Sequence, residues 1–132
     1  MTYNHLVLAT LHTKGTVNAI DRIIVAFPST QQQQIRVQLA TVLRTVVSQQ
    51  LLPDSQGGTV PVFELMQVTG AVRSLIRDNK NHQLENVIAT GAKDGMISMD
   101  QSILALYKAG RITADTALHY CDHPEQLQRN LR

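Results

Sequence analysis

The sequence has one cysteine, no tryptophan and few aromatic residues of any kind. Because Cys121 has no second cysteine to pair with, the chain has no internal disulfide, which fits a reducing compartment. With only 4% aromatic residues, it is poorly supplied with the stacking surfaces that bind single-stranded nucleic acid. Twelve Lys and Arg against ten Asp and Glu leave a formal charge of +2, too little to attract nucleic acid or an anionic membrane. We therefore expect no nucleic-acid partner.

A second shortage is at the N-terminus, where MTYNHLVLATLHTKG lacks the basic start and the long apolar run of a signal or membrane anchor. We expect a cytoplasmic protein that is not inserted in a membrane. The length, 132 residues, suits one domain, and a hydrophobic content of 43% is enough for a sizeable core.

The first half of the chain predicts one strand followed by two helices. Residues 5–13, HLVLATLHT, form a continuous aliphatic run, typical of a strand that is covered on both faces. The spacing of apolar residues predicts a helix over residues 16–27 and a longer one over residues 29–50, with Ser29 and Gln32 as a candidate capping box. The expected apolar stripe of the longer helix comprises Ile35, Leu39, Val42, Leu43, Val46 and Val47.

The second half predicts a hairpin and a group of short helices. Turn residues between positions 53 and 58 separate two runs of strand-forming residues, and Pro61 places the second strand at a sheet edge. Helices are expected over residues 69–78, 82–90, 99–109 and 113–121. A doubly covered strand at residues 5–13 needs neighbouring strands, so the sequence looks like the back end of a larger α/β protein.

Residues 71–78, AVRSLIRD, combine an apolar stripe with two like charges. On a helix, Val72, Leu75 and Ile76 share one face. Arg73 and Arg77 lie four residues apart beside that face, where like charges repel by about 0.2 to 0.5 kcal/mol. A packing helix explains the apolar stripe but not the arginine pair. We therefore expect this helix to present an interaction face that meets negative charge on a partner or a neighbouring subunit.

Five stretches of the chain match one family in order and spacing: HLVLATLHT, AIDRIIVAFP, QIRVQLATVLRTVVSQQLLP, AVRSLIRD and GMISMDQSILALYKAGRIT. Together they resemble the C-terminal part of the PilT family of twitching-motility ATPases, which retract type IV pili. In that family TLHT is the histidine box beside the nucleotide, and AIRNLIRE is the signature associated with retraction. This chain has Val72, Ser74 and Asp78 where the signature has Ile, Asn and Glu. The related extension ATPases carry a four-cysteine zinc module, which one cysteine cannot build.

The resemblance implies a fold, a division and an activity for the longer protein. The implied fold class is α/β, the C-terminal portion of a RecA-like P-loop ATPase core followed by a cluster of short helices. Residues 1–67 would end that core, and residues 68–132 would form a C-terminal helical subdomain with the signature helix. The implied function is a pilus retraction motor, a homohexamer that hydrolyses ATP with Mg²⁺ at the cytoplasmic face of the inner membrane, beside the pilus platform components.

The phosphate-binding motif is the most important absence. G-x-x-x-x-G-K-[ST] is needed to cradle phosphates, and the chain contains no Gly-Lys pair. The acidic Walker B segment, expected just before residue 5, is absent as well. We therefore expect that the chain alone neither hydrolyses ATP nor binds it tightly. The resemblance then implies a piece of an ATPase, or a product that starts at an internal methionine.

The resemblance also assigns roles to residues. It implies that His12, followed by Thr13 in the TLHT motif, senses the terminal phosphate of the nucleotide. On position alone, a single histidine here is more often a structural residue. Arg22 and Arg36 lie on helix edges, where they are either solvated or ion-paired, or reach the nucleotide of a neighbouring subunit. The interaction signature comprises Ala71, Val72, Arg73, Ser74, Leu75, Ile76, Arg77 and Asp78.

Other interpretations of the same residues remain open. His119 and His123 lie at i and i+4, which would let two imidazoles share a metal, but further ligands are not evident and we expect a frayed helix end. The alternative to a motor is a non-catalytic helical interaction module that kept the AVRSLIRD face. A P-loop upstream of Met1 would distinguish the two. A DNA-binding helical domain is disfavoured by the balanced charge and the few aromatic residues.

Overall fold

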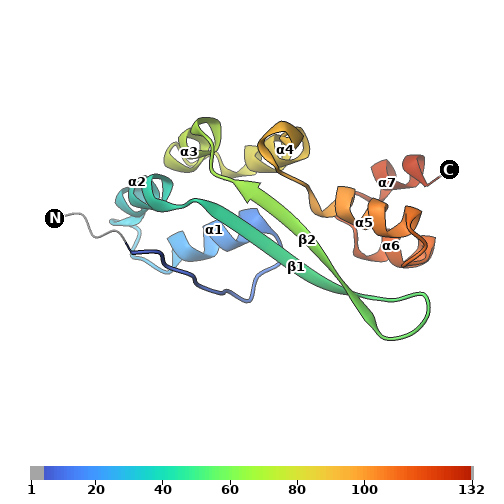
Figure 1. Ribbon diagram of the computed structural model, residues 1–132. Coiled ribbons are helices and arrows are strands. Elements are labelled where there is room, and N and C mark those ends of the chain that lie inside the picture. The colour runs from blue at the N-terminus through green and yellow to red at the C-terminus, as the bar shows by residue number, and fades with distance from the viewer. Residues whose placement is uncertain (1–4, 132) are drawn as a thin grey trace.

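The computed structural model describes residues 5–131, in which short helices surround a long two-stranded hairpin (Figure 1). The strands β1 (Thr45–Pro53) and β2 (Thr59–Gln67) pair antiparallel, from Thr45 opposite Gln67 to Pro53 opposite Thr59. The helices are α1 (Thr16–Val25), α2 (Gln32–Val42), α3 (Gly70–Arg77), α4 (Leu84–Ala89), α5 (Met99–Lys108), α6 (Ala114–Tyr120) and α7 (Pro124–Asn130), with 3₁₀ turns at Asn81–Gln83 and Ala92–Asp94. In the described part of the chain, no helix is long and apolar enough to cross a membrane.

The hairpin is predicted correctly, and its closed end is fastened to the loop between α5 and α6. The guanidinium of Arg111 lies 3.1 Å from the carboxylate of Asp54, and the Ser55 hydroxyl donates to the carbonyl oxygen of Gly110 at 2.9 Å. The backbone amide of Gln56 and then Arg111 lower the pKa of Asp54 below its usual range. These contacts hold the turn against the C-terminal helices.

Two hydrophobic clusters lie along the hairpin. The first cluster joins α1 to α4 with the open end of the hairpin and comprises Ile20, Ile24, Ala40, Met66, Val72, Ile76, Leu84, Ile88 and Met96. The second cluster joins α5 to α7 with the closed end and comprises Leu52, Val60, Val62, Met99, Ile103, Ile112, Ala117, Cys121 and Leu127. One strand, β2, supplies residues to both clusters, so the hairpin connects the two ends of the molecule.

The strand predicted over residues 5–13 is not formed. The segment adopts neither helix nor strand, and its residues up to His12 are exposed, with Leu6 and Leu8 at 86% and 87%. Among the described residues, the sheet contains only β1 and β2, which pair with each other. The aliphatic run therefore has the composition of a doubly covered strand without the strands beside it that would pair with its backbone.

The helix predicted over residues 29–50 is too long. Helix α2 begins at Gln32 without a side-chain cap, so the proposed capping box of Ser29 and Gln32 is not formed. It ends at Val42, and Val46 and Val47 belong to β1. A run of only three β-branched residues, Thr45 to Val47, fits the spacing of a helix as well as that of a strand. Pairing with β2 makes these residues part of a strand.

The other helices follow the prediction closely, with one addition. The expected helices over residues 69–78, 99–109 and 113–121 are α3, α5 and α6, and the one over residues 82–90 is a 3₁₀ turn followed by α4. Helix α7 was not expected. Pro124 is the first residue of α7, a position where the missing N–H of proline costs nothing.

Candidate functional site

His12 and Thr13 lie on the surface, just before α1. His12 is exposed, and its carbonyl oxygen accepts a hydrogen bond from Arg22 Nη1 at 3.4 Å. Gly15 then turns the chain into α1 with a φ of 87°, a conformation that other residues rarely adopt. The structure thus brings one of the two predicted arginines to the histidine segment, through the backbone of His12 and not through its ring.

Arg36 has a different environment. It lies half-buried on α2, and its Nη1 atom is buried with no hydrogen-bond partner among the residues that the structure describes. Arg22 is thus exposed with one backbone contact, Arg36 is half-buried, and a contact of either with the nucleotide of a neighbouring subunit stays a prediction.

The signature helix α3 is built as the sequence predicts. The Thr69 hydroxyl accepts a hydrogen bond from the Val72 amide at 3.3 Å and caps the helix. Val72 and Ile76 are fully buried in the first cluster, and Leu75 is half-buried against it. The apolar stripe of AVRSLIRD is thus part of the core.

The two arginines of α3 have unequal roles. Arg73 is half-buried, and its Nε donates to the carbonyl oxygen of Ala40 at 3.0 Å, in the last turn of α2, where carbonyl groups lack helical partners. Arg77 is about half exposed and pairs loosely with Asp78 at 3.5 Å, while its carbonyl accepts from Gln33. The two like charges on α3 are therefore used differently. Arg73 caps a neighbouring helix, and Arg77 faces solvent.

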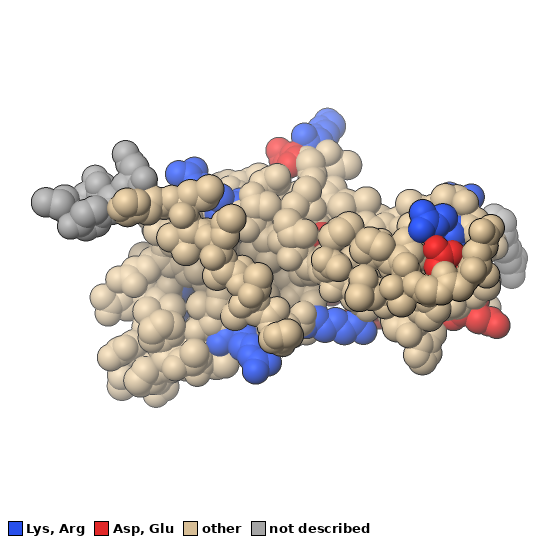
Figure 2. All heavy atoms as spheres, turned by 60° about the horizontal axis from the view of Figure 1, so that its bottom comes forward, with Lys and Arg blue, Asp and Glu red and all other residues tan. Residues whose placement is uncertain are grey.

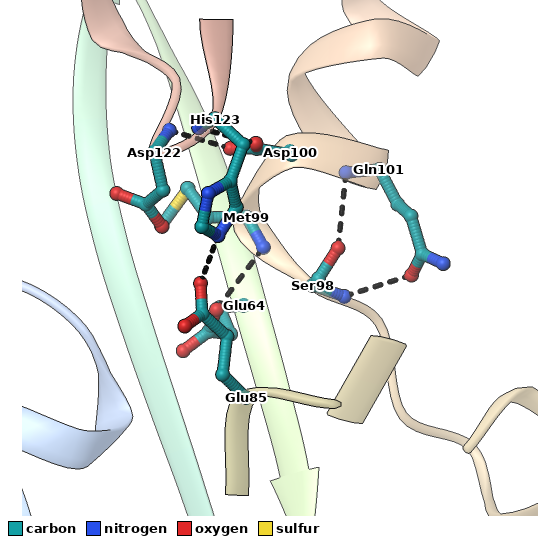
Figure 3. A network of polar contacts seen from close by, with 8 residues as sticks. All are labelled: Glu64, Glu85, Ser98, Met99, Asp100, Gln101, Asp122 and His123. Carbon is teal, nitrogen blue, oxygen red and sulfur yellow. Dashed lines mark hydrogen bonds and ion pairs between the residues drawn. The ribbon is translucent and has the colours of Figure 1, made fainter. Parts of the chain in front are cut away.

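A polar hollow of about 400 Å³ lies between α4, α5 and α7. The imidazole of His123, just before α7, pairs with the Glu85 carboxylate of α4 (Figure 3). Asp100 lies in the first turn of α5, and both of its carboxylate oxygens accept hydrogen bonds from backbone amides. The donors are the amides of Asp122, at 2.7 Å, and His123, at 2.9 Å. The start of α7 is therefore held from two sides, which corrects the expectation of a frayed helix end.

The charges around this hollow shift the pKa values of its groups. The hydrogen bond to Glu85 raises the pKa of His123 above its usual value, against a smaller effect of burial. Burial, and then the nearby Asp100 and Glu64, raise the pKa of Asp122, while the ammonium group of Lys14 acts to lower it. Lys14 belongs to the same surface segment as His12, so that segment lies within electrostatic reach of the loop before α7.

Sequence analysis missed this cluster because its members are far apart in the chain. Glu85 and His123 are separated by 38 positions. His119 lies in α6 and His123 precedes α7, so the two histidines do not share a helical face. No group of three or more potential metal ligands gathers within residues 5–131. One missed residue did leave a signal: Glu64 takes an inward position in the alternating stretch VPVFELM.

Comparison with known proteins gives related sequences across most of the chain, although no protein-family model matches it. The chain is 48% identical over 108 residues to the uncharacterized protein YggR of Escherichia coli, 82% of this chain and 33% of that protein. It is 39% identical to the twitching motility protein of Neisseria gonorrhoeae, over 93% of this chain and 33% of that protein. It is 36% identical to the type IV pilus retraction ATPase PilT of Pseudomonas aeruginosa, over 93% and 36% of the two chains.

The chain belongs to the PilT family. The crystal structure of the pilus retraction motor PilT with bound ADP superposes with a TM-score of 0.82 at 38% identity, over 95% of this chain and 35% of that one. The predicted fold class, the C-terminal part of such an ATPase, is thereby confirmed, apart from the strand at residues 5–13. The chain spans about a third of the length of the PilT relatives that it matches.

Proposed function

We propose that this chain is the C-terminal part of a type IV pilus retraction motor, which couples ATP hydrolysis in a homohexamer to pilus disassembly. The observation that supports this most is the similarity to retraction ATPases at 36% to 39% identity over 93% of the chain. The motor would work in the cytoplasm, at the inner face of the membrane beside the pilus platform. Residues 1–67 would complete the ATPase core, and residues 68–132 would form the helical subdomain.

ATP and Mg²⁺ would be held by other parts of that motor. The chain has no Gly-Lys pair, so its own residues do not form the phosphate cradle of a P-loop. Its contribution would be His12, whose side chain is exposed and free to approach a phosphate group held elsewhere. Thr13 would follow in the same segment. Arg22 and Arg36 would be the candidates for contact across a subunit boundary.

The test is a chimera that carries residues 5–131 in place of the matching third of the Neisseria gonorrhoeae protein. We expect His12→Ala to lower kcat for ATP hydrolysis by about tenfold or more while the Kd for nucleotide stays nearly unchanged. A donor that acts on the developing charge contributes to the transition state and little to ground-state binding.

The matched control is His119→Ala, which removes an exposed imidazole of α6. Its turnover should equal that of the unsubstituted chimera. If kcat for ATP hydrolysis were unchanged in His12→Ala, His12 would have only a structural role. For the isolated chain, calorimetry should detect no ATP binding in the micromolar range, and such binding would contradict the missing phosphate cradle.

A second candidate function, a non-catalytic interaction module, is favoured by the surface of α3. Arg77 is exposed and pairs loosely with Asp78 at 3.5 Å. Such a face suits a partner that carries carboxylates. In a motor, the same face would serve contact with a neighbouring subunit or the pilus platform.

Single substitutions of the two arginines separate the interaction from the fold. We expect Arg77→Ala to leave the melting temperature of the chain nearly unchanged and to abolish pilus retraction by the chimera. Arg73→Ala should lower stability by about 1 to 3 kcal/mol, because the Ala40 carbonyl loses a charged donor. Normal twitching motility in Arg77→Ala would show that this arginine merely faces water.

A further inference from the structure

The one buried carboxylate on the inner face of the hairpin lies at the boundary between the two hydrophobic clusters. The inward residues of β2 are Val60, Val62, Glu64 and Met66, of which the first two belong to the second cluster and the last to the first. Glu64 is 7% exposed, and Ser48, opposite it on β1, is buried as well. A charged side chain in such a place costs folding energy unless it is fully hydrogen-bonded.

Both oxygens of Glu64 accept hydrogen bonds from the starts of helices. Oε1 accepts from the amide of Thr16, the first residue of α1, at 3.1 Å. Oε2 accepts from the amide of Met99, the first residue of α5, also at 3.1 Å (Figure 3). A negative charge is favoured at both places, because unpaired N–H groups and the helix dipole converge there. One carboxylate therefore serves two helices from different clusters.

Each of these helix starts continues into a segment of functional interest. Thr16 is four residues after His12, and the intervening turn is held by Asn18, whose amide group donates to the Lys14 carbonyl at 2.6 Å. Met99 opens α5, whose Asp100 holds the start of α7. One path from the histidine segment to the C-terminal helices thus runs through the Glu64 side chain, with a direct hydrogen bond on each side.

We propose that Glu64 is a positioning residue that links the His12 segment to α5, so that a displacement of one helix start is passed to the other. The Glu64 carboxylate accepts one hydrogen bond from each helix start. Loss of one hydrogen bond frees the side chain to move and thereby weakens the other. This inference rests on the function proposed above only for the source of the displacement, which would be contact between His12 and a nucleotide.

The link is tested in the 132-residue chain by amide hydrogen exchange, without nucleotide. Thr16→Pro removes the amide that Oε1 accepts, at a first helical position where proline is well tolerated. We expect exchange at the distant Met99 amide to accelerate about threefold or more, the low end of coupling between groups of one network. The matched control is Thr16→Val, which keeps the amide and the side-chain volume and removes only the hydroxyl. It should leave Met99 exchange unchanged.

Two further measurements make the result decisive. In the Glu64→Gln background, where one side-chain atom can no longer accept an amide, Thr16→Pro should have no additional effect on Met99. In the unsubstituted chain at low denaturant, the Thr16 and Met99 amides should open with the same free energy and the same denaturant dependence, a comparison that needs no variant. Independent openings, or an unchanged Met99 rate in a folded Thr16→Pro chain, would overturn the link.

The chimera separates this inference from the function on which it rests. Nucleotide should change exchange at the starts of both α1 and α5 in the unsubstituted protein, and only at α1 in Glu64→Gln, with nucleotide affinity retained. A response of both sites in Glu64→Gln would contradict the link. If nucleotide changes neither site in the unsubstituted protein, the role proposed for His12 is wrong, and the Thr16→Pro experiment still decides on Glu64.

Discussion

Residues 5–67 and residues 68–131 differ in how they treat their apolar side chains. Within the described chain, all the large hydrophobic side chains that are exposed precede residue 64: Leu6, Val7, Leu8, Leu11, Val25, Phe27, Val37, Val42, Val47, Leu51 and Phe63. The later helices bury their large hydrophobic residues wholly or in part. Figure 2, which brings the lower side of Figure 1 forward, shows a face with few charged side chains. The first region thus presents an apolar surface, and the second a polar one.

The hairpin shows this difference within one element. Its inward residues pack into both clusters, but Val47 and Leu51 on β1 and Phe63 on β2 point outward and stay exposed. Exposed apolar side chains gathered on one face of a strand pair are typical of a surface that meets other protein. The first region therefore exposes apolar side chains that suit contact with another protein surface, whereas the second buries its own large apolar side chains. The division of the chain after residue 67, into the end of an ATPase core and a helical subdomain, stays a prediction.

The strongest destabilisation is expected from core substitutions, which test whether the two hydrophobic clusters, each built from residues of both regions, unfold together. Ile24 in α1 and Ile103 in α5 are both almost fully buried, one in each cluster. We expect Ile24→Ala and Ile103→Ala each to lower the free energy of unfolding by about 2 to 5 kcal/mol, measured by denaturant titration. Because β2 supplies both clusters, each variant should shift one common transition. Two separate transitions, each moved by only one variant, would divide the molecule between the two hydrophobic clusters.

A smaller effect sharpens the contrast between the two surfaces. Replacing Leu51 and Phe63 with Thr should change the free energy of unfolding by less than about 0.5 kcal/mol, since both side chains are exposed and Thr suits a strand. The same double variant should reduce self-association of the isolated chain in light scattering. Stability lost at the level of a buried substitution would mean that the outer face of the hairpin is covered within this chain.

The smallest expected effect concerns the ion pair that helps to hold α7 in the second region. Because Glu85 raises the pKa of His123 in the folded state, the stabilisation is fully present below the unfolded pKa of about 6.5. It is lost as pH rises through the folded value. Both side chains are about half exposed, so we expect less than about 1 kcal/mol.

An NMR titration of the His123 ring measures this pKa directly. It should lie above that of an unperturbed histidine, and Glu85→Gln should lower it and remove the corresponding pH dependence of unfolding. His82→Ala is the control, since it deletes another imidazole of the same hollow and keeps the pair. An unshifted titration of His123 in the unsubstituted chain would show that Asp100 alone holds the start of α7.

Several elements of the fold follow from local signals in the sequence. The turn between residues 53 and 58, the start of α3 at its Thr69 cap and the helical spacing of the second half each depend on residues within a few positions of one another. The family followed from short motifs for the same reason. Where the local signal was ambiguous, as at Val46 and Val47, the prediction was wrong.

The partners of the charged side chains depend instead on tertiary packing. Arg73 finds its acceptor 33 positions away, Glu64 joins amides 48 and 35 positions away, and Glu85 meets a histidine 38 positions along the chain. The segment at residues 5–13 likewise depends on strands beside it and not on its own composition. Caps and periodicity act over one or two turns of the backbone, whereas the partner of a buried or half-buried charge is chosen by how distant elements pack.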